Sequence, residues 1–334
     1  MISRPPSAAG AAIWDAALDP GRGARSSKEE LVVAIRIAGV TKRFGTHVAV
    51  NDLSLSVPEG AVYGFIGPNG SGKTTTLRMI LNILVPDQGE IEVLGRRDLR
   101  AAKDEIGYLP EERSLYKKMK VRQALRYFGA LKGLKRRELD PRIDPWLERF
   151  DLVKWADKKI ETLSKGMSQK VQFIATIVSD PKLVILDEPF SGLDPVNADI
   201  LRDAVLELHR RGSTVVFSTH DMEMAEKLCD VIFMIFRGNK VLDAPLDAIQ
   251  RQYGEDTVRL RLGSGAPPLE GLPGVRAVRD YGNYKEVRYD GDPQVLLQQV
   301  SARANVQLFE IARPSLHDIF VRIAGPEAAE VKRV

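Results

Sequence analysis

The sequence predicts an α/β protein with a mainly parallel sheet, to which an antiparallel β-subdomain, an inserted helical subdomain and a small C-terminal α+β domain are added. Three observations lead to this class. Largely apolar runs of strand length alternate with segments of helical periodicity, and the runs are Val62–Ile66, Leu183–Leu186, Val215–Ser218 and Val231–Phe236. Such runs are buried on both faces, which is typical of parallel sheets covered by helices. A glycine-rich loop follows the first run directly.

The elements before this loop predict a small antiparallel sheet. Residues 1–33 mix Pro, Gly, Ala, Ser and Arg without the apolar core of a signal peptide, so a disordered tail is expected there. Residues 34–252 are expected to form the main domain. Its short strand-like segments, around Ile35 and at 48–55 and 90–94, are broken by turns and flank the glycine loop.

A helical subdomain is expected at about residues 111–165, where Leu125, Phe128 and Leu131 recur at helical spacing. The surrounding residues 113–170 hold 17 Lys and Arg against 7 Asp and Glu, a local excess of 10. A solvated helical face would explain this charge, and so would a surface that meets an anionic membrane leaflet or a partner.

The pattern of apolar residues changes after the main domain. Residues 253–325 are expected to form an α+β accessory domain, followed by a tail at 326–334. Strand-like segments at 258–262, 284–289 and 306–311 are joined by a Gly/Pro-rich link and a helical segment, and a short helix begins after Pro314. A domain of this size can hold its own core.

Composition limits the function classes. The chain has 334 residues, 44% of them hydrophobic, a formal charge of +4 and a pI near 9.0, which is too mild to indicate a nucleic-acid partner. No apolar run approaches the roughly 18 residues that span a bilayer, so work at a membrane is expected to go through a partner. Cys229 is the only cysteine, which excludes an internal disulfide and favours a cytosolic compartment.

The glycine loop fits the phosphate-binding pattern G-x-x-x-x-G-K-[ST] between a strand and a helix, which predicts a P-loop NTPase core. Glycines let the backbone wrap around an anion, so that N–H groups and the positive end of the helix point at the same phosphates. Lys73 is expected to reach the β- and γ-phosphates, and the Thr74 hydroxyl to ligate Mg²⁺. The residues expected to hold ATP here are Gly67, Pro68, Asn69, Gly70, Ser71, Gly72, Lys73, Thr74 and Thr75.

Hydrolysis also needs groups that hold the metal and activate water, and polar residues stand where they can do so. The apolar run at 183–186 ends in Asp187 and Glu188, which places both at the carboxyl edge of the sheet, where ligands bind. Asp187 is expected to hold Mg²⁺, directly or through water, and Glu188 to take the proton from the attacking water. His220 follows the next strand and could donate a hydrogen bond to the γ-phosphate.

Over about residues 35–250 these motifs resemble the ATPases of the ATP-binding cassette (ABC) family. Residues 163–167, Leu-Ser-Lys-Gly-Met, stand where that family carries its L-S-G-G-Q signature. The resemblance implies that Ser164 and Gly166 contact the γ-phosphate of ATP held by a second subunit. It also implies that Phe44 stacks on adenine and that a loop called the D-loop communicates across the dimer. The D-loop residues are Ser191, Gly192, Leu193 and Asp194.

Two departures from the family pattern bear on function. Lys165 and Met167 replace a Gly and a Gln of the commonest signature, while the serine and the second glycine remain. Glu111 stands where many relatives carry a Gln that senses Mg²⁺ and the membrane subunit; a carboxylate can also ligate Mg²⁺, but its extra negative charge conflicts with the usual role in placing water. Together with residues 314–320, these departures resemble the type-two exporters of drugs, antibiotics or sodium.

The resemblance implies a transport motor that uses ATP and Mg²⁺. Two copies would sandwich two ATP, close, and pull on a separate integral-membrane permease, with no nucleic acid involved. The chain would then be cytoplasmic and peripheral, held at the inner face of the cell membrane by the permease. The alternative is a soluble, non-transport ABC ATPase acting on a nucleic-acid or ribosomal complex. Such relatives usually carry two fused cassettes or a long coiled coil, and the sequence shows neither.

Overall fold

The computed structural model describes residues 32–112, 115–254, 257–263, 268–312 and 314–324. The chain divides between Ala244 and Pro245 into two compact units. The expected tails lie outside the described residues, apart from 32 and 33. Val33 already belongs to the first strand, so regular structure begins one residue earlier than expected.

The first unit is built on a six-stranded sheet in the order β5-β6-β7-β3-β8-β9. Neighbouring strands from β5 to β8 run parallel, and the predicted class is therefore confirmed. The central strands β3, β6 and β7 are buried along their whole length, because helices cover the sheet. The strands are β3 Val62–Ile66, β5 Ile106–Leu109, β6 Leu183–Asp187, β7 Thr214–Thr219, β8 Val231–Phe236 and β9 Asn239–Pro245.

A second, antiparallel sheet of order β2-β1-β4 lies beside the parallel one, as the sequence predicts. Its strands are β1 Val33–Phe44, β2 His47–Pro58 and β4 Gln88–Val93. One apolar core joins residues of both sheets with the first helix, α2 Lys73–Ile80. The helix at the end of the glycine loop is thereby held from two sides.

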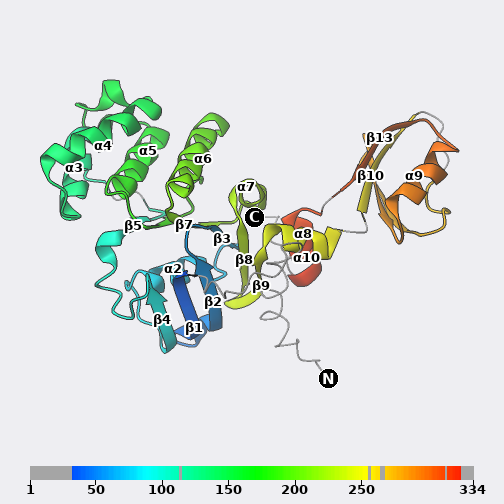
Figure 1. The fold of residues 1–334 in the computed structure, drawn as a ribbon, viewed down its shortest axis with the longest axis horizontal. Helices are drawn as coiled ribbons and strands as arrows, with labels where there is room; N and C mark the ends of the chain where they lie inside the picture. The colour runs from blue at the N-terminus through cyan, green and yellow to red at the C-terminus, as the bar shows by residue number, and fades with distance from the viewer. Residues whose placement is uncertain (1–31, 113–114, 255–256, 264–267, 313, 325–334) are drawn as a thin grey trace, which may run out of the picture. The chain divides into compact units, whose positions relative to one another are not determined.

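The helical subdomain is grouped at the end of this unit away from the antiparallel sheet (Figure 1). It consists mainly of α3 Val121–Leu131, α4 Arg136–Arg149 and the start of α5 Lys165–Ile177. Arg126 makes two 2.7 Å hydrogen bonds to Asp140, which ties α3 to α4. The remaining helices of the unit are α6 Pro195–Arg210, α7 Met222–Leu228 and the short 3₁₀ turns η1 Lys103–Glu105, η2 Val153–Trp155 and η3 Ile160–Thr162.

The second unit is an antiparallel sheet of order β11-β12-β10-β13, with its own apolar core against α9. The compact unit starts at Pro245, so α8 belongs to it, and the division falls before the expected boundary at 252/253. Arg322 of α10 donates a 3.1 Å hydrogen bond to the Tyr253 carbonyl of α8. The elements are α8 Leu246–Gly254, β10 Thr257–Leu262, β11 Val275–Asp280, β12 Lys285–Tyr289, α9 Pro293–Ser301, β13 Val306–Ile311 and α10 Leu316–Ala324. Among the residues described, no helix combines the length and apolarity that a membrane span requires.

Candidate active site

The glycine loop leaves β3 at Ile66 and enters α2 at Lys73, and close packing requires two of its glycines, Gly67 and Gly72. A Cβ atom at Gly67 would lie 2.2 Å from the Ile235 carbonyl oxygen, and one at Gly72 would lie 2.5 Å from the Ala49 carbonyl oxygen. Gly72 also has a φ of 108°, which side chains with a Cβ rarely adopt. The loop therefore keeps its backbone free to approach a ligand.

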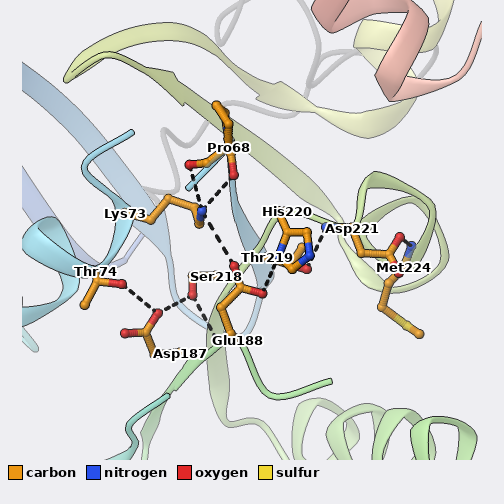
Figure 2. Close-up of polar contacts among 11 residues, drawn as sticks. Pro68, Lys73, Thr74, Asp187, Glu188, Ser218, Thr219, His220, Asp221 and Met224 are labelled. Carbon is orange, nitrogen blue, oxygen red and sulfur yellow. Dashed lines mark hydrogen bonds and ion pairs between the residues drawn. The ribbon is translucent and has the colours of Figure 1, made fainter. Parts of the chain in front are cut away.

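Lys73 is buried, with 5% of its surface exposed, and its ammonium group lies inside the loop. Nζ donates to the carbonyl oxygens of Gly67 at 2.7 Å and Pro68 at 3.2 Å, and lies 3.6 Å from Glu188 Oε1 (Figure 2). Burial lowers the pKa of Lys73, and the negative charges of Glu188 and Asp187 oppose this shift. An incoming phosphate would add favourable negative charge beside a cation that is only partly compensated.

Asp187, the last residue of β6, is held between two hydroxyl groups. Ser218 of β7 donates to its Oδ1, and Thr74 of α2 donates to the same oxygen at 3.2 Å (Figure 2). The parallel register of β6 and β7 places Asp187 opposite Ser218, and this pairing is what brings the two side chains together. The other carboxylate oxygen, Oδ2, is buried and has no hydrogen-bond partner among the described residues.

Glu188 is fixed by its backbone and by two side chains. Its N–H donates to Ser218 Oγ at 3.0 Å, and its Oε2 lies 3.0 Å from Nδ1 of His220. Its φ of 48° is in the left-handed region, which costs a non-glycine residue about 1 kcal/mol. This conformation turns the carboxylate toward Lys73 at the carboxyl edge of the sheet (Figure 2).

The residues at this edge fit a Mg²⁺ ion that shares its coordination with a substrate. Mg²⁺ is usually held by one or two protein oxygens, with phosphate oxygens and waters completing the octahedron. Thr74 and Asp187 supply such oxygens next to each other, and Asp187 Oδ2 and Ser71 Oγ are buried without a partner in the described part of the chain. Within the described part of the chain there is no group of three or more His, Cys, Asp or Glu that could hold a metal ion.

Glu111, the third expected metal ligand, lies just after β5 and is exposed. It is near enough to the loop that its charge is one of those raising the pKa of Lys73 against the effect of burial. None of the described hydrogen bonds joins it to Thr74 or Asp187.

Phe44 ends β1 and keeps 49% of its surface exposed. Lys42 lies 5.7 Å from the centre of its ring and also forms a 2.8 Å ion pair with Asp87. An exposed aromatic ring held beside a cation can provide a stacking surface for a base.

Ser164 and Gly166 lie at the start of α5, and none of the described hydrogen bonds joins them to the phosphate loop. Ser164 is the N-cap of the helix, where its Oγ accepts the Met167 N–H at 3.2 Å, and its side chain is exposed. A Cβ at Gly166 would lie 3.7 Å from Leu193 Cδ2, so the signature adjoins the D-loop. Within the D-loop, Ser191, Gly192 and Asp194 are exposed, and Asp194 caps α6 by accepting the Asn197 N–H at 3.0 Å.

One residue of the site was missed by sequence reasoning. Ser218 is fully buried and connects both carboxylate residues, since it donates to Asp187 and accepts from Glu188 N–H. The available signal was a hydroxyl residue near the end of an otherwise apolar strand.

A groove of about 320 Å³ lies between the parallel sheet and the helical subdomain. Its apolar lining includes Leu115 and Phe128, and Ile83 and Leu131 expose more than half of their surfaces at it. The lining residues are Leu81, Ile83, Lys103, Ile106, Gly107, Tyr108, Pro110, Leu115, Phe128, Leu131, Lys132, Gln172, Ala175 and Thr176.

Strand, glycine loop and helix in this order, with acidic residues at the adjacent strand end, define a P-loop nucleotide-binding protein. The profile of the family described as "ABC transporter" matches residues 50–191. A second profile, the C-terminal domain of DrrA1-3-like ATP-binding proteins, matches residues 245–324, which coincides with the second compact unit.

Relatives of known sequence extend the match over most of the chain. The chain is 40% identical over 293 residues to an uncharacterized ABC transporter ATP-binding protein, YhaQ of Bacillus subtilis, covering 87% of this chain and 98% of that protein. It is 36% identical over 305 residues to Nod factor export ATP-binding protein I of Rhizobium sp. strain N33, covering 88% and 98%. A solved ATP-binding subunit of an ABC transporter superposes with a TM-score of 0.62 at 30% identity, covering 66% of this chain and 93% of that one.

The chain belongs to the family of ABC transporter ATP-binding proteins. It is an ATP-binding subunit and an ATPase coupled to transport, as the motifs predicted. The reported relatives give no support to a non-transport ATPase that acts on a nucleic-acid or ribosomal complex.

Proposed function

We propose that this subunit drives an exporter, and that it does so by closing head-to-tail on a second copy around two ATP molecules. A relative of 36% identity is an export ATP-binding protein, and the C-terminal profile is that of DrrA-like proteins, which supports the exporter branch. A separate integral-membrane permease would form the transport path and hold the chain at the inner face of the cell membrane. No nucleic acid is expected to take part.

Each residue at the carboxyl edge of the sheet has a proposed role. The loop Gly67–Thr75 would hold the phosphates through its N–H groups, with Lys73 on the β- and γ-phosphates and Phe44 on the adenine. When bound, Mg²⁺ would neutralise charge that develops on the phosphates, and Thr74 and Asp187 would hold it, with Glu111 nearby. Glu188 would accept the proton of the attacking water.

His220 would work with Glu188 rather than apart from it. Its Nδ1 contacts the Glu188 carboxylate at 3.0 Å, and 54% of its side-chain surface is exposed. The imidazole can therefore fix the carboxylate on one side and offer its other nitrogen to the γ-phosphate.

The observation that carries head-to-tail closure is the separation of two halves of the site within one chain. Lys73 and Glu188 lie together, while Ser164 caps its own helix at the surface. A second copy would supply Ser164 and Gly166 to the γ-phosphate, with the helix N-terminus behind them. The D-loop residues 191–194, which adjoin Gly166, would carry the contact between the two sites.

The groove between the sheet and the helical subdomain is the proposed dock for a cytoplasmic helix of the permease. It is apolar and open, it lies beside β5, which leads to Glu111, and Lys103 and Lys132 stand in its lining. The local excess of basic residues at 113–170 favours an acidic partner surface.

The concentration dependence of ATP hydrolysis tests the shared site. Because each complete site needs two chains, activity per chain should be low when dilute and rise with concentration. Phosphate release measured over a hundredfold range of chain concentration should therefore increase more than linearly. Strictly linear release, with unchanged activity per chain, would show that one chain is sufficient.

A further inference from the structure

Lys165 lies in the signature between Ser164 and Gly166. Those two residues have a proposed role in contacting phosphate, but Lys165 has none so far. It is the first residue of α5, and its side chain is exposed. A cation at this position is unfavourable for the helix, because the N-terminus already carries partial positive charge. Some other interaction should therefore account for a lysine here.

Lys165 is exposed, and its ammonium group has no ion-pair partner among the residues that the structure describes. A Cβ atom built on Gly192 would lie 3.3 Å from Lys165 Nζ, so the lysine lies over the D-loop glycine. The nearby Asp194 is engaged, because it accepts hydrogen bonds from both the backbone and the side chain of Asn197.

Two helices begin at this surface and concentrate positive potential there. Ser164 caps α5 and Asp194 caps α6, and Gly166 packs near Leu193 and Asn197 between the two caps. Gly192 has a φ of 69° and no side chain, which leaves room above the loop for the lysine. The surface thus combines helix N–H groups, a hydroxyl and a free ammonium group, which suits a multiply charged phosphate.

We propose that Lys165 binds the γ-phosphate of the ATP held by a second copy of the chain, as a positioning residue that tightens the ATP-bound dimer. This inference rests on the proposed head-to-tail closure. The lysine acts as a point charge across the interface, so its contribution depends on salt, whereas the Ser164 hydroxyl and the Gly166 backbone contribute directed hydrogen bonds. ATP binding to a single chain does not involve it, because that chain's own loop holds the phosphates.

The test places Lys165→Ala and Lys73→Ala either in different chains or in the same chain, all with Glu188→Gln to stop hydrolysis. In the first pair, a dilute fluorescent Lys165→Ala chain is titrated with a Lys73→Ala chain. The ATP held by the Lys165→Ala chain then faces the intact Lys165 of the Lys73→Ala chain. In the second pair, a dilute fluorescent chain without either change is titrated with the Lys165→Ala/Lys73→Ala chain, so its ATP faces the alanine.

Both pairs contain the same substitutions. Both titrants carry Lys73→Ala, so they do not hold ATP and cannot form an ATP-bound dimer with a copy of themselves. With Mg-ATP, the second pair should dimerise roughly tenfold more weakly than the first, and its affinity should fall less steeply with added salt. Lys165→Arg in the same position should restore most of the affinity, because it keeps the charge. ATP binding to dilute single chains should be unchanged by Lys165→Ala.

Equal affinities and equal salt dependence in the two pairs would overturn the role of Lys165. Lys158→Ala is the matched control, since it removes one exposed lysine from the same subdomain and should leave dimerisation unchanged. If the Glu188→Gln chain with Lys165 intact shows no ATP-dependent dimer at all, then the proposed closure itself is wrong. That result is distinct from a failure of the lysine alone.

Discussion

At the scale of single residues, the site depends on groups that are buried before any ligand arrives. Lys73, Asp187 and Glu188 each expose less than a tenth of their surface. Burial of charge is costly, and the ion pair at 3.6 Å together with hydrogen bonds to the loop carbonyls offsets only part of it. A bound triphosphate with its metal would complete the charge balance, so the empty site should be less stable than the loaded one.

Replacing Glu188 by glutamine separates binding from hydrolysis. The amide keeps the shape of the side chain but accepts a proton poorly, so turnover should fall about 10²–10⁴-fold while ATP binding persists. Phosphate release and nucleotide binding, measured on the same preparation, check this. Glu223→Gln, the same change at an exposed acid of α7, should leave turnover unchanged, and near-normal turnover of Glu188→Gln would remove it as the base.

Replacing Ser218 by alanine should damage both stability and turnover. The buried Glu188 N–H would lose its acceptor, at a cost of about 1–3 kcal/mol in the free energy of unfolding, and Asp187 would lose a donor. Ser213→Ala removes a comparable buried hydroxyl, which donates to the Pro181 carbonyl at 2.9 Å away from the site. Thermal unfolding should shift in both variants, whereas only Ser218→Ala should lower turnover with saturating ATP.

The sequence was sufficient to predict the site residues that belong to a motif. It was insufficient for site residues that meet only because two elements are neighbours in the fold. Lys73 and Thr74 follow from the loop pattern, and Asp187 and Glu188 follow from the end of an apolar strand. Ser218 matters only because β6 and β7 are neighbours, and spacing along the chain does not reveal that pairing. The contact of Lys165 with the D-loop is hidden for the same reason.

At the scale of elements, β3 is fixed at both ends, by the glycine loop and by β9. Tyr63 is fully buried in β3, and its hydroxyl donates to Asp243 Oδ1 of β9 at 2.6 Å. Burial raises the pKa of Asp243, although the hydrogen bond from Tyr63 and the nearby Lys240 work against this. The strand that leads into the phosphate loop is thus attached to a carboxyl group that resists ionisation.

Asp243→Asn should change the pH dependence of stability. The folded pKa is raised above the unfolded value near 3.8, so the native state binds more protons between the two values. This group therefore lowers the free energy of unfolding as pH rises through that window, and the loss is complete above the folded pKa. Asparagine can still accept from Tyr63 and does not ionise, so the variant should gain stability relative to the parent as pH rises from about 4 to neutrality.

Chemical unfolding at several pH values measures this difference. Tyr63→Phe is the informative companion, because it removes the donor and leaves a buried carboxyl without that hydrogen bond, which should make the fall with pH steeper. A difference between parent and Asp243→Asn that stays constant with pH would show that Asp243 does not titrate in this range.

Helices and strands with a clear hydrophobic pattern could be predicted, and those with a weak hydrophobic pattern could not. Strands β3, β6, β7 and β8 are largely apolar runs, and they appear where the sequence places them. The sequence did not predict β5 of the same sheet, because it has only four residues and includes Gly107. β11 has only half-exposed or exposed residues, so its sequence lacks the contrast that marks a strand. The helical periodicity of α8 does not indicate to which unit the helix belongs. The structure assigns α8 to the second unit, which places the division between Ala244 and Pro245.

At the scale of the whole molecule, two separate cores imply two units that can fold independently. The core of the first unit draws on residues between Ile35 and Ile235, and that of the second on residues between Val258 and Val300. The matched family profiles fall on the same two regions. Nucleotide binding should therefore depend on the first unit alone.

A chain that ends after Pro245, where β9 ends, tests this independence. It should fold cooperatively and bind ATP within about twofold of the full chain, because the phosphate loop and both carboxylates remain. Nucleotide binding and a single thermal transition are the measurements. Loss of ATP binding by a chain that retains its secondary structure would show that the second unit supports the site.

The left-handed backbone of Glu188 has a consequence for attempts to improve this protein. A glycine at that position would relieve the unfavourable φ, but it would also remove the carboxylate that lies 3.6 Å from the buried Lys73 ammonium group. Loss of one partner of a buried ion pair costs more than the strain of one left-handed residue, so Glu188→Gly is expected to be the less heat-resistant protein. A laboratory screen for heat resistance would therefore retain the group proposed to activate water, because the same carboxylate balances the charge of the lysine.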